Sequence, residues 1–398
     1  MPKKDLRVAL VCDWLTNVGG AEKVLLAIHQ MYPQAPIYTS KYDKKGIDWF
    51  LDADVRTGWL QIFPSFLRRF LSPLRQHYFS HLDLSDYDLV ISVTGAEAKA
   101  VKTHKEQGKT EQKTVDSEQT EHRSVHLCYC HVPTQYYWQL YDDYLKNPGF
   151  GVLNPLARIA LKIFVKPMRK RDYESAQQPD YFITISDYAK EQIKKYYNRE
   201  AKVIYPPVDV EKFSTDLSTS MKIKKGKSQA KKQLNYIITS RQVNWKRIDL
   251  CIKACLKANQ KLTVVGDGPE HKKLLMMAGN SPLITFLPQM SQAELKKQLE
   301  KADAYLFPSL EPFGIAPIEA MAMGLPVIAY GKGGAVDYVK PGVNGFLFEH
   351  QTTDSLADAM KQFNIDDYSR EKIQKTVLKF DKKVFVEKMW EEINEKVK

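Results

Sequence analysis

The chain has 398 residues, of which 43% are hydrophobic and 27% are charged, and its formal net charge is +12. This composition is typical of a globular protein, and the length exceeds one ordinary core, so we expect two domains. The sequence contains no run of about 18 apolar residues, which argues against a membrane-spanning helix. The positive charge indicates an anionic partner, either a phosphate-bearing substrate, an anionic lipid or a nucleic acid.

The N-terminus and the cysteines place the chain in a reducing cytoplasm. The opening MPKKDLRVALVCDW has an apolar run of about seven residues and no small-residue cleavage site, so it predicts a first core strand and not a signal peptide. Five cysteines do not make a disulfide framework, and the spacing of Cys128 with Cys130 and of Cys251 with Cys255 has no matching metal ligands. We expect buried free thiols.

The first half of the chain alternates apolar runs with helical patterns. Such continuous apolar strands predict a parallel sheet that is covered on both faces. The expected strands are residues 6–12, 89–93, 125–130, 181–185 and 203–205, and the expected helices are residues 21–32 and, after the cap Ser186, residues 187–197.

The second half repeats this plan, so the fold class is α/β with two doubly wound, Rossmann-like domains in series. The expected strands are residues 236–240, 261–265, 283–286, 304–307 and 327–329, and the expected helices are residues 248–258, residues 292–302 and one that opens after Gly314.

We place the domain boundary after Pro207. Residues 1–207 form the first domain and residues 208–380 the second, and an amphipathic helix at 381–398 is expected to pack back on the first. Residues 103–124 are polar and read as a flexible insertion. Residues 215–234 contain a lysine-rich run that is typical of a solvated linker.

Candidate site residues follow the predicted strands. In a doubly wound sheet, ligands bind at the carboxyl ends of the strands. The residues there are Gly19, Gly20, His131, Arg241, Lys246, Gly266, Gly268 and the stretch from Glu311 to Glu319.

The chemistry of these residues suits a ligand with phosphates and hydroxyl groups. Arg241 and Lys246 follow one strand, and a guanidinium with an ammonium can hold two phosphates. The helix that starts near Gly20 adds backbone N–H groups and a positive dipole end. Glu311 lies in a loop and Glu319 about one turn into the next helix, where their carboxylates can accept hydrogen bonds from hydroxyls. By themselves, two glutamates eight residues apart are a weak signal, because most such pairs belong to a surface helix.

The surrounding sequence is more specific. Residues 311–329 read EPFGIAPIEAMAMGLPVIA, and this run resembles the signature of glycosyltransferase family 4, a family of retaining transferases with the GT-B fold. That fold has two Rossmann-like domains facing across a cleft. The resemblance extends to Gly19-Gly20-Ala21-Glu22, to SRQVNWKRID at 240–249, to VVGDGPE at 264–270 and to GGAVDYVKPGVNGFLF at 333–348.

The resemblance implies a role for each matching position. It assigns the donor hexose to Glu311, the ribose to Glu319 and the diphosphate to Arg241 and Lys246. It places His131 beside the sugar, so the expected catalytic residues are Glu311, His131, Arg241 and Lys246. The expected donor-binding residues are Gly19, Gly20, Arg241, Lys246, Gly266, Gly268, Glu311, Phe313, Gly314, Ile315 and Glu319.

The chain departs from the family in the loop between Arg241 and Lys246. The family's acidic residue there is replaced by Asn244 or Trp245, although both cations remain. Asp13 can cap the first loop or contact the acceptor.

We expect no metal and no cofactor besides the nucleotide sugar. The pair Asp86 and Asp88 precedes its strand, so it lies at the wrong end of the sheet for a metal site. Asp52 and Asp54 have the same spacing. Arg241, Lys246 and helix N-termini can stabilise the charge of the leaving group instead.

The expected activity is retaining transfer of a hexose to a glycan or lipid-linked acceptor in cell-surface polysaccharide synthesis. Residues 130–145 and YPPVD at 205–209 are most similar to mannosyltransferases, which makes GDP-mannose the leading donor. UDP-glucose, UDP-galactose and UDP-N-acetylglucosamine remain alternatives. Other readings are a GT-B sugar-nucleotide epimerase and a non-enzymatic basic protein that binds a membrane surface.

Two basic amphipathic segments, residues 63–78 and 153–171, suit an anionic membrane surface. The second has an equally plausible reading as a core-packed helix with a solvated basic face. Aromatic residues at 136–144 lie among acidic ones, which disfavours nucleic acid. We therefore expect a cytoplasmic protein that is peripheral at the inner face of the membrane.

Overall fold

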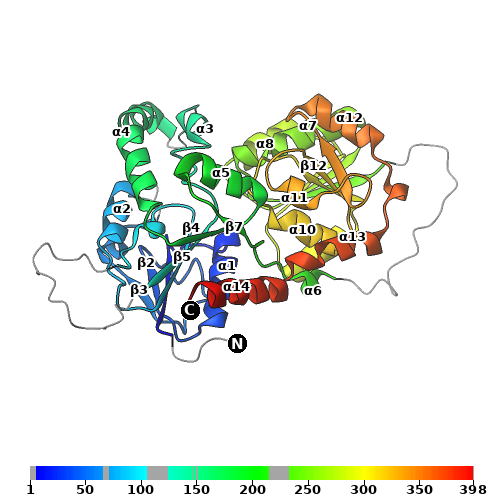
Figure 1. The fold of residues 1–398 in the computed structure, drawn as a ribbon. Coiled ribbons are helices and arrows are strands. Elements are labelled where there is room, and N and C mark those ends of the chain that lie inside the picture. The colour runs from blue at the N-terminus through cyan, green and yellow to red at the C-terminus, as the bar shows by residue number, and fades with distance from the viewer. Residues whose placement is uncertain are drawn as a thin grey trace, which may run out of the picture. The chain divides into compact units, whose positions relative to one another are not determined.

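The computed structural model describes residues 6–65, 71–104, 124–146, 148, 151–214 and 233–397. The chain divides into two compact units (Figure 1). Unit 1 is Met1–Pro207 with Phe385–Lys398, and unit 2 is Val208–Val384. The predicted insertion at 103–124 and the predicted linker at 215–234 lie for the most part outside the described residues, as do residues 66–70 of the basic segment 63–78.

Unit 1 is built on a seven-stranded parallel sheet with the order β3-β2-β1-β4-β5-β6-β7. Every residue of the central strands β1 and β4 is buried, which accounts for their unbroken apolar sequences. The strands are β1 (Val8–Cys12), β2 (Ile37–Thr39), β3 (Val55–Thr57), β4 (Leu89–Thr94), β5 (Val125–Cys130), β6 (Tyr181–Thr184) and β7 (Lys202–Val203).

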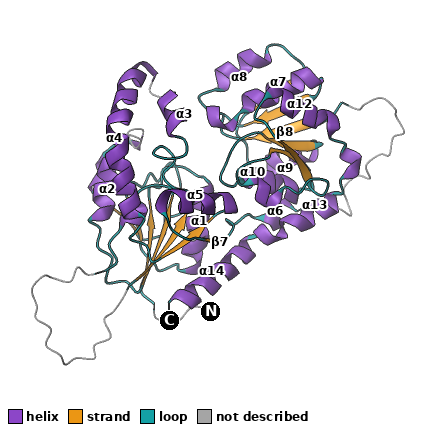
Figure 2. Ribbon diagram, turned by 45° about the horizontal axis from the view of Figure 1, so that its top comes forward, coloured by secondary structure: helices purple, strands orange, loops and turns teal. Residues whose placement is uncertain are grey.

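Helices connect these strands and cover the sheet (Figure 2). The Ser186 hydroxyl accepts a hydrogen bond from the Ala189 N–H, which caps α5 as predicted, and Asn198 ends that helix with a left-handed φ of 52°. The helices are α1 (Gly20–Met31), α2 (Ser72–Ser80), α3 (Tyr141–Lys146), α4 (Asn154–Ser175), α5 (Asp187–Tyr197) and the 3-10 turns at Trp59–Ile62, Ala98–Ala100 and Gly151–Leu153.

The C-terminal helix α14 (Lys382–Lys396) belongs to unit 1 from Phe385 onward. The Phe385 ring lies 5.9 Å from the ring of Tyr129, between centroids, and the Trp390 ring lies 5.1 Å from that of Tyr32. Phe385 is almost fully buried, and burial of such a side chain contributes about 1.5–3 kcal/mol.

Unit 2 contains a six-stranded parallel sheet with the order β10-β9-β8-β11-β12-β13. Its strands are β8 (Asn235–Thr239), β9 (Lys261–Val265), β10 (Ile284–Leu287), β11 (Ala304–Phe307), β12 (Val327–Tyr330) and β13 (Gly345–Phe348). Its helices are α6 (Val210–Phe213), α7 (Ile248–Ala258), α8 (His271–Ala278), α9 (Gln292–Glu300), α10 (Ile315–Ala322), α11 (Ala335–Tyr338), α12 (Thr353–Gln362) and α13 (Arg370–Val377), with 3-10 turns at Asn244–Lys246, Ile365–Asp367 and Leu378–Phe380.

Both sheets confirm the predicted α/β class with doubly wound topology. In each, the strand order reverses at one point, between β1 and β4 in unit 1 and between β8 and β11 in unit 2. The loops after those neighbouring strands run to opposite faces of the sheet, which leaves a crevice where ligands of this fold class bind.

The cysteines agree with the prediction, since all five are free and buried. Burial is the first cause that raises the pKa of Cys251 and of Cys255 on α7. Within the described part of the chain, no helix combines the length and the apolar character needed to cross a bilayer.

Candidate functional site

The reversal point of unit 2 brings two predicted site residues together. Lys246 lies in the loop after β8 and Glu311 in the loop after β11, and the Lys246 Nζ is 2.5 Å from the Glu311 Oε2. The other oxygen of Glu311 accepts a 2.6 Å hydrogen bond from the Ser309 hydroxyl. The two charged side chains are 25% and 17% exposed, so solvent and a ligand can still reach them.

The Glu311 loop is held in place by its neighbour after β12. The Gly334 N–H donates to the Glu311 carbonyl at 2.8 Å. Gly333 has a φ of 77°, and a Cβ there would lie 2.5 Å from the same carbonyl oxygen. Only glycines allow this approach, so the backbone beneath the Glu311 carboxylate is fixed.

The helix α10 starts directly after this loop. Its N-cap is Gly314, with a φ of 103°, and no side chain caps the helix. A Cβ on Gly314 would lie 2.6 Å from the Phe307 ring and 2.9 Å from the Tyr338 hydroxyl. The first N–H groups of α10, from Ile315 onward, therefore start beside Glu311 without a side-chain acceptor, an arrangement that favours an anion.

Glu319 lies on α10 and is partly buried. After burial itself, the carboxylates of Glu311 and Glu319 both raise the pKa of the fully buried Tyr305 hydroxyl. The structure therefore brings the two predicted glutamates into one neighbourhood. Phe313, between them, is buried against Tyr338 and Phe380, with ring centroids 5.7 Å from each.

Arg241 follows β8 but does not join the Lys246–Glu311 pair. Its side chain is exposed, and no ion pair of Arg241 is found among the described residues. The loop that carries it is anchored by its neighbour Gln242, which is fully buried. A guanidinium on an anchored backbone with no acidic partner suits a phosphate.

Gln242 joins the loops after β8 and β9. Its Nε2 donates to the Gly266 carbonyl at 2.6 Å, and its backbone N–H donates to the Asp267 carbonyl at 2.8 Å. A Cβ on Gly268 would lie 2.4 Å from the Gln242 carbonyl oxygen, so the predicted glycines serve this close contact. Our sequence reasoning missed Gln242, because a single glutamine beside an arginine carries no signal of burial.

In unit 1, Asp13 lies at the reversal point between β1 and β4. Its carboxylate accepts hydrogen bonds from the Thr94 hydroxyl and from the N–H groups of Gly95, Ala96 and Ala98, at 2.8–3.1 Å. Burial, and then the nearby Glu97, raise the pKa of Asp13, while these donors oppose the shift. Asp13 therefore caps the loop after β4, and its contact with an acceptor stays a prediction.

The other predicted residues of unit 1 follow their strands as expected. Gly19 is the N-cap of α1 and has no side-chain cap, and a Cβ on it would lie 2.8 Å from the Glu22 carboxylate. His131 follows β5, and its backbone N–H donates to the Thr94 carbonyl at 2.9 Å. Its Nε2 is closed off from solvent and has no hydrogen-bond partner among the described residues. Burial lowers the pKa of His131 to about 4, so the ring is neutral near pH 7.

The helix α4 exposes several large apolar side chains. Leu156, Ile159, Ile163 and Phe164 are each between 57% and 66% exposed, which rules out a core-packed face for them. The buried residues of α4 that the structure describes begin at Val165. In Figures 1 and 2, α4 extends beyond the sheet of unit 1 with α3 beside it.

No group of three or more His, Cys, Asp or Glu side chains within the described ranges is arranged to hold a metal. Asp88 accepts hydrogen bonds from the Arg7 backbone and guanidinium at the amino end of β4, and Asp54 pairs with Arg56 just before β3. Both acidic pairs therefore lie at the amino edge of the sheet.

Residues 219–380 match the family model of glycosyl transferases group 1. An uncharacterised glycosyltransferase of Methanocaldococcus jannaschii is 31% identical over 205 residues, which are 48% of this chain and 53% of that protein. A GDP-mannose-dependent alpha-(1-6)-phosphatidylinositol monomannoside mannosyltransferase of Mycobacterium tuberculosis is 26% identical over 205 residues, covering 47% and 53%. The chain thus spans about half the length of the curated relatives it matches.

Solved structures resemble the whole chain. Anabaena HepE in complex with UDP has a TM-score of 0.66 at 19% identity, covering 98% of this chain and all of that one. Sucrose-phosphate synthase from Thermosynechococcus elongatus has a TM-score of 0.66 at 16% identity, covering 98% and 99%. At these identities the likeness concerns the fold, and it confirms the predicted GT-B class.

Proposed function

We propose, because residues 219–380 match the family model of glycosyl transferases group 1, that the chain transfers a hexose from a nucleotide sugar to a glycan or lipid-linked acceptor. The observation that carries this proposal is the Lys246–Glu311 pair at the reversal point of unit 2, directly before the open N-terminus of α10. A cation, a carboxylate and a helix N-terminus without a side-chain cap suit a ligand that has both phosphate and hydroxyl groups.

In this proposal, unit 2 binds the donor. The diphosphate lies against Arg241, Lys246 and the N–H groups that start at Ile315. Glu311 accepts hydrogen bonds from the hexose and Glu319 from the ribose. The backbone of Phe313 and Gly314 lies along the diphosphate, and the glycine loop at 266–268 lines the base. Gly19, Gly20 and His131 then belong to unit 1, which we propose binds the acceptor.

The ion pair exchanges partners when the donor binds. Before that, Lys246 and Glu311 neutralise each other across 2.5 Å. The diphosphate then competes for the ammonium, and the freed Glu311 carboxylate accepts from the hexose hydroxyls. Each group keeps a partner throughout, so neither is left desolvated and unpaired.

We propose transfer with retention of the anomeric configuration. The bond between the anomeric carbon and the diphosphate oxygen breaks, and its electron pair leaves with the diphosphate. The acceptor oxygen bonds to that carbon from the same face, and its proton passes to the departing diphosphate. Arg241, Lys246 and the start of α10 stabilise the leaving charge without a metal ion. Product of inverted linkage in an NMR spectrum would contradict this mechanism.

GDP-mannose is the donor we propose first. It is supported by the resemblance to mannosyltransferases, one of which is named as GDP-mannose-dependent. UDP-sugars compete with this choice, since HepE was solved with UDP. Thermal shifts with GDP-mannose, UDP-glucose, UDP-galactose and UDP-N-acetylglucosamine decide between them, because the preferred donor stabilises unit 2 by mass action.

For the acceptor we propose a polyprenyl-linked glycan of surface-polysaccharide synthesis, reached from an anionic membrane at its cytoplasmic face. The exposed apolar face of α4 and its basic neighbours support this. The same face also favours a second candidate, a non-enzymatic membrane-binding protein. Turnover of a nucleotide sugar that is lost in Glu311→Ala separates the two, because membrane binding alone would survive that change.

A further inference from the structure

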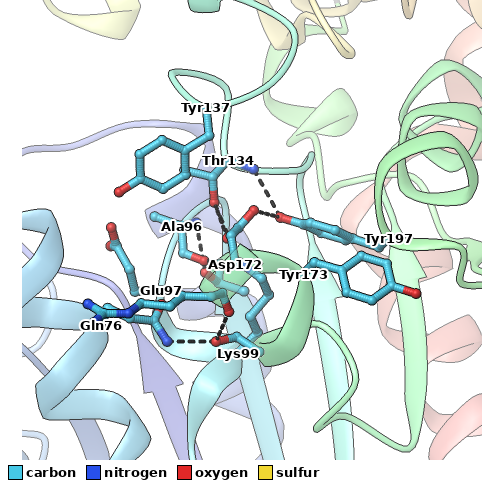
Figure 3. A network of polar contacts seen from close by, with 12 residues as sticks. Gln76, Ala96, Glu97, Lys99, Thr134, Tyr137, Asp172, Tyr173 and Tyr197 are labelled. Atoms are coloured by element: carbon cyan, nitrogen blue, oxygen red, sulfur yellow. Dashed lines mark hydrogen bonds and ion pairs between the residues drawn. The ribbon is translucent and has the colours of Figure 1, made fainter. Parts of the chain in front are cut away.

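A buried cluster in unit 1 lies outside the residues proposed to bind the donor. Its centre is Asp172 on α4, and its other members are Lys99, Thr134, Trp138 and Tyr197; we call it the Asp172 cluster. Figure 3 shows Thr134 and Tyr197 pointing toward the Asp172 carboxylate. Asp172 is only 1% exposed, so its carboxylate is almost completely buried.

Asp172 accepts hydrogen bonds from all four other members. The Lys99 Nζ and the Thr134 hydroxyl donate to one carboxylate oxygen at 2.7 and 2.8 Å. The Trp138 Nε1 and the Tyr197 hydroxyl donate to the other at 2.7 and 2.8 Å. Tyr197 also accepts from the Thr134 N–H at 3.1 Å. Charge-assisted bonds of this kind are short and directional, so they fix the groups that make them.

The five members come from four separate segments of unit 1. Lys99 is in the 3-10 turn after β4, and Tyr197 is the last residue of α5. Thr134 and Trp138 belong to the loop after β5, residues 131–138, which begins at His131. Burial alone would lower the pKa of Lys99, but the charge of Asp172 raises it, so the ammonium stays protonated.

The 131–138 loop also contacts α4 about one helical turn before Asp172, at Arg169. The Arg169 Nε donates to the Tyr137 carbonyl at 2.6 Å. The Arg169 guanidinium lies 5.2 Å from the centroid of the Trp138 ring. On its other side, the loop meets a second buried ion pair, because the Tyr136 hydroxyl donates at 2.6 Å to Glu97, which is paired with Arg75 at 2.8 Å.

We propose that Asp172 is a positioning residue for sugar transfer: it holds the 131–138 loop in the conformation that presents His131. This inference rests on the proposed function. Two features of the structure support it. Four donors converge on one carboxylate, and two of them lie in the loop itself. The loop starts with a half-buried histidine whose Nε2 has no hydrogen-bond partner among the described residues, so no such bond fixes this end of the ring.

The test compares Asp172→Asn with a matched control in the full chain. The asparagine keeps the shape but removes the charge and half of the acceptor capacity. Glu392→Gln is the control, because Glu392 is also a buried carboxylate of unit 1, paired with Lys202 away from the loop. Release of the nucleoside diphosphate from the four donors above measures turnover without an identified acceptor. Hydrogen exchange of the peptide 131–138 measures the order of the loop.

We expect Asp172→Asn to lower kcat about 10- to 100-fold, the cost of a small misplacement in a site, while the KM for the donor changes less than about twofold. Exchange in 131–138 should rise in Asp172→Asn and stay unchanged in Glu392→Gln. Should Asp172→Asn fail to fold, Tyr197→Phe and Thr134→Val each remove one donor to Asp172, and a smaller loss of kcat with faster exchange supports the inference.

Three results overturn this inference. Unchanged exchange in 131–138 contradicts the holding of the loop, and faster exchange with unchanged kcat contradicts its link to transfer. Wild-type protein that turns over none of the donors contradicts the proposed function, and the inference falls with it. Turnover by the wild-type protein therefore distinguishes failure of the inference alone from failure of the proposed function.

Discussion

Lys246 and Glu311 are 65 positions apart in sequence, and the Lys246 Nζ lies 2.5 Å from the Glu311 Oε2. They meet because β8 and β11 pair side by side where the strand order of unit 2 reverses, so the loops that follow both strands open at the same place. The pair is partly exposed, and an ion pair in such a position contributes little stability by itself. We therefore expect the Lys246–Glu311 pair to contribute to ligand binding more than to stability.

Lys246→Met and Glu311→Gln should affect the donor differently. A hydrogen bond to a charged group contributes about 1.5–3 kcal/mol, so each variant should lose about 10- to 100-fold in kcat/KM for the nucleotide sugar. Lys246→Met should also weaken binding of the nucleoside diphosphate alone. Glu311→Gln should leave that binding nearly unchanged, because Glu311 is assigned to the hexose. Calorimetry with GDP and UDP, beside turnover, measures both effects.

Lys257→Met is the matched control for this prediction. Lys257 forms an exposed ion pair with Asp354, with 2.7 Å between nitrogen and oxygen, on the outer helices of unit 2. The Lys257→Met substitution removes one positive charge, as Lys246→Met does, but it leaves the loops of Lys246 and Glu311 unchanged. Equal loss of diphosphate affinity in Lys257→Met and Lys246→Met would show that only the net charge matters, and our assignment of Lys246 would then be wrong.

Gly314→Ala tests the start of α10. The φ of 103° disfavours any side chain, at about 1–3 kcal/mol, and the new Cβ would meet the Phe307 ring at 2.6 Å. We expect a loss of about 3 kcal/mol in the free energy of unfolding of unit 2, measured by urea denaturation. Gly279→Ala provides the comparison, because its φ is 57° but the space around it is open. Its cost should be near 1 kcal/mol, from the backbone alone.

Much of the fold follows from the sequence pattern. Residues 248–258, 261–265 and 304–307 were predicted with the bounds that α7, β9 and β11 have in the structure. Residues that end helices and strands, such as Gly266 after β9, mark the bounds of these elements. Their apolar runs are also long enough to be recognised in the sequence. The short strands β2 and β3 were missed, because three residues each give no measurable periodicity.

The sequence predicts the site residues whose chemical type suits the ligand. It does not predict the residues whose role depends on being buried. The positions of Lys246 and Glu311 follow from loops after neighbouring strands, and the structure joins them. Gln242 and Asp172 are both almost fully buried and are bonded to residues far away in sequence. A single sequence gives no sign of such pairing, since most glutamines and aspartates are exposed.

His126 predicts a loss of stability in acid. It is fully buried on β5, its Nε2 is 2.8 Å from the Ser92 hydroxyl, and burial lowers its pKa to about 3. The unfolded chain, with a histidine pKa of about 6.5, takes up the proton first as the pH falls. The free energy of unfolding should therefore decrease as the pH falls below about 6.5, by about 3 kcal/mol at pH 4.

Urea denaturation between pH 7 and pH 4 measures this dependence. The slope of the free energy of unfolding against pH reports the number of protons taken up on unfolding. In His126→Gln this number should fall by up to one between pH 7 and pH 4. His350→Gln, at a side chain that is 78% exposed, should keep the wild-type slope. An unchanged slope in His126→Gln would mean that His126 is not the group that destabilises the fold in acid.

The exposed face of α4 predicts binding to anionic vesicles. Ile159→Ser with Ile163→Ser removes two apolar side chains that are each more than half exposed, so the fold should tolerate the change. Lys162→Gln with Lys166→Gln removes two exposed charges from the same helix. Each basic residue near such a surface contributes about 1 kcal/mol, so the lysine variant should bind vesicles of phosphatidylglycerol about 30-fold more weakly.

The wild type and the lysine variant should differ in how salt affects their binding to vesicles. Electrostatic attraction is screened at high ionic strength, whereas apolar insertion is not, so wild-type binding should weaken with salt and the lysine variant should respond less. Lys372→Gln with Lys375→Gln removes the same charge from α13 in unit 2 and should bind as the wild type does. Vesicle co-sedimentation provides the measurement. Unchanged binding in both α4 variants would exclude α4 as the membrane contact and leave its apolar face to a protein partner.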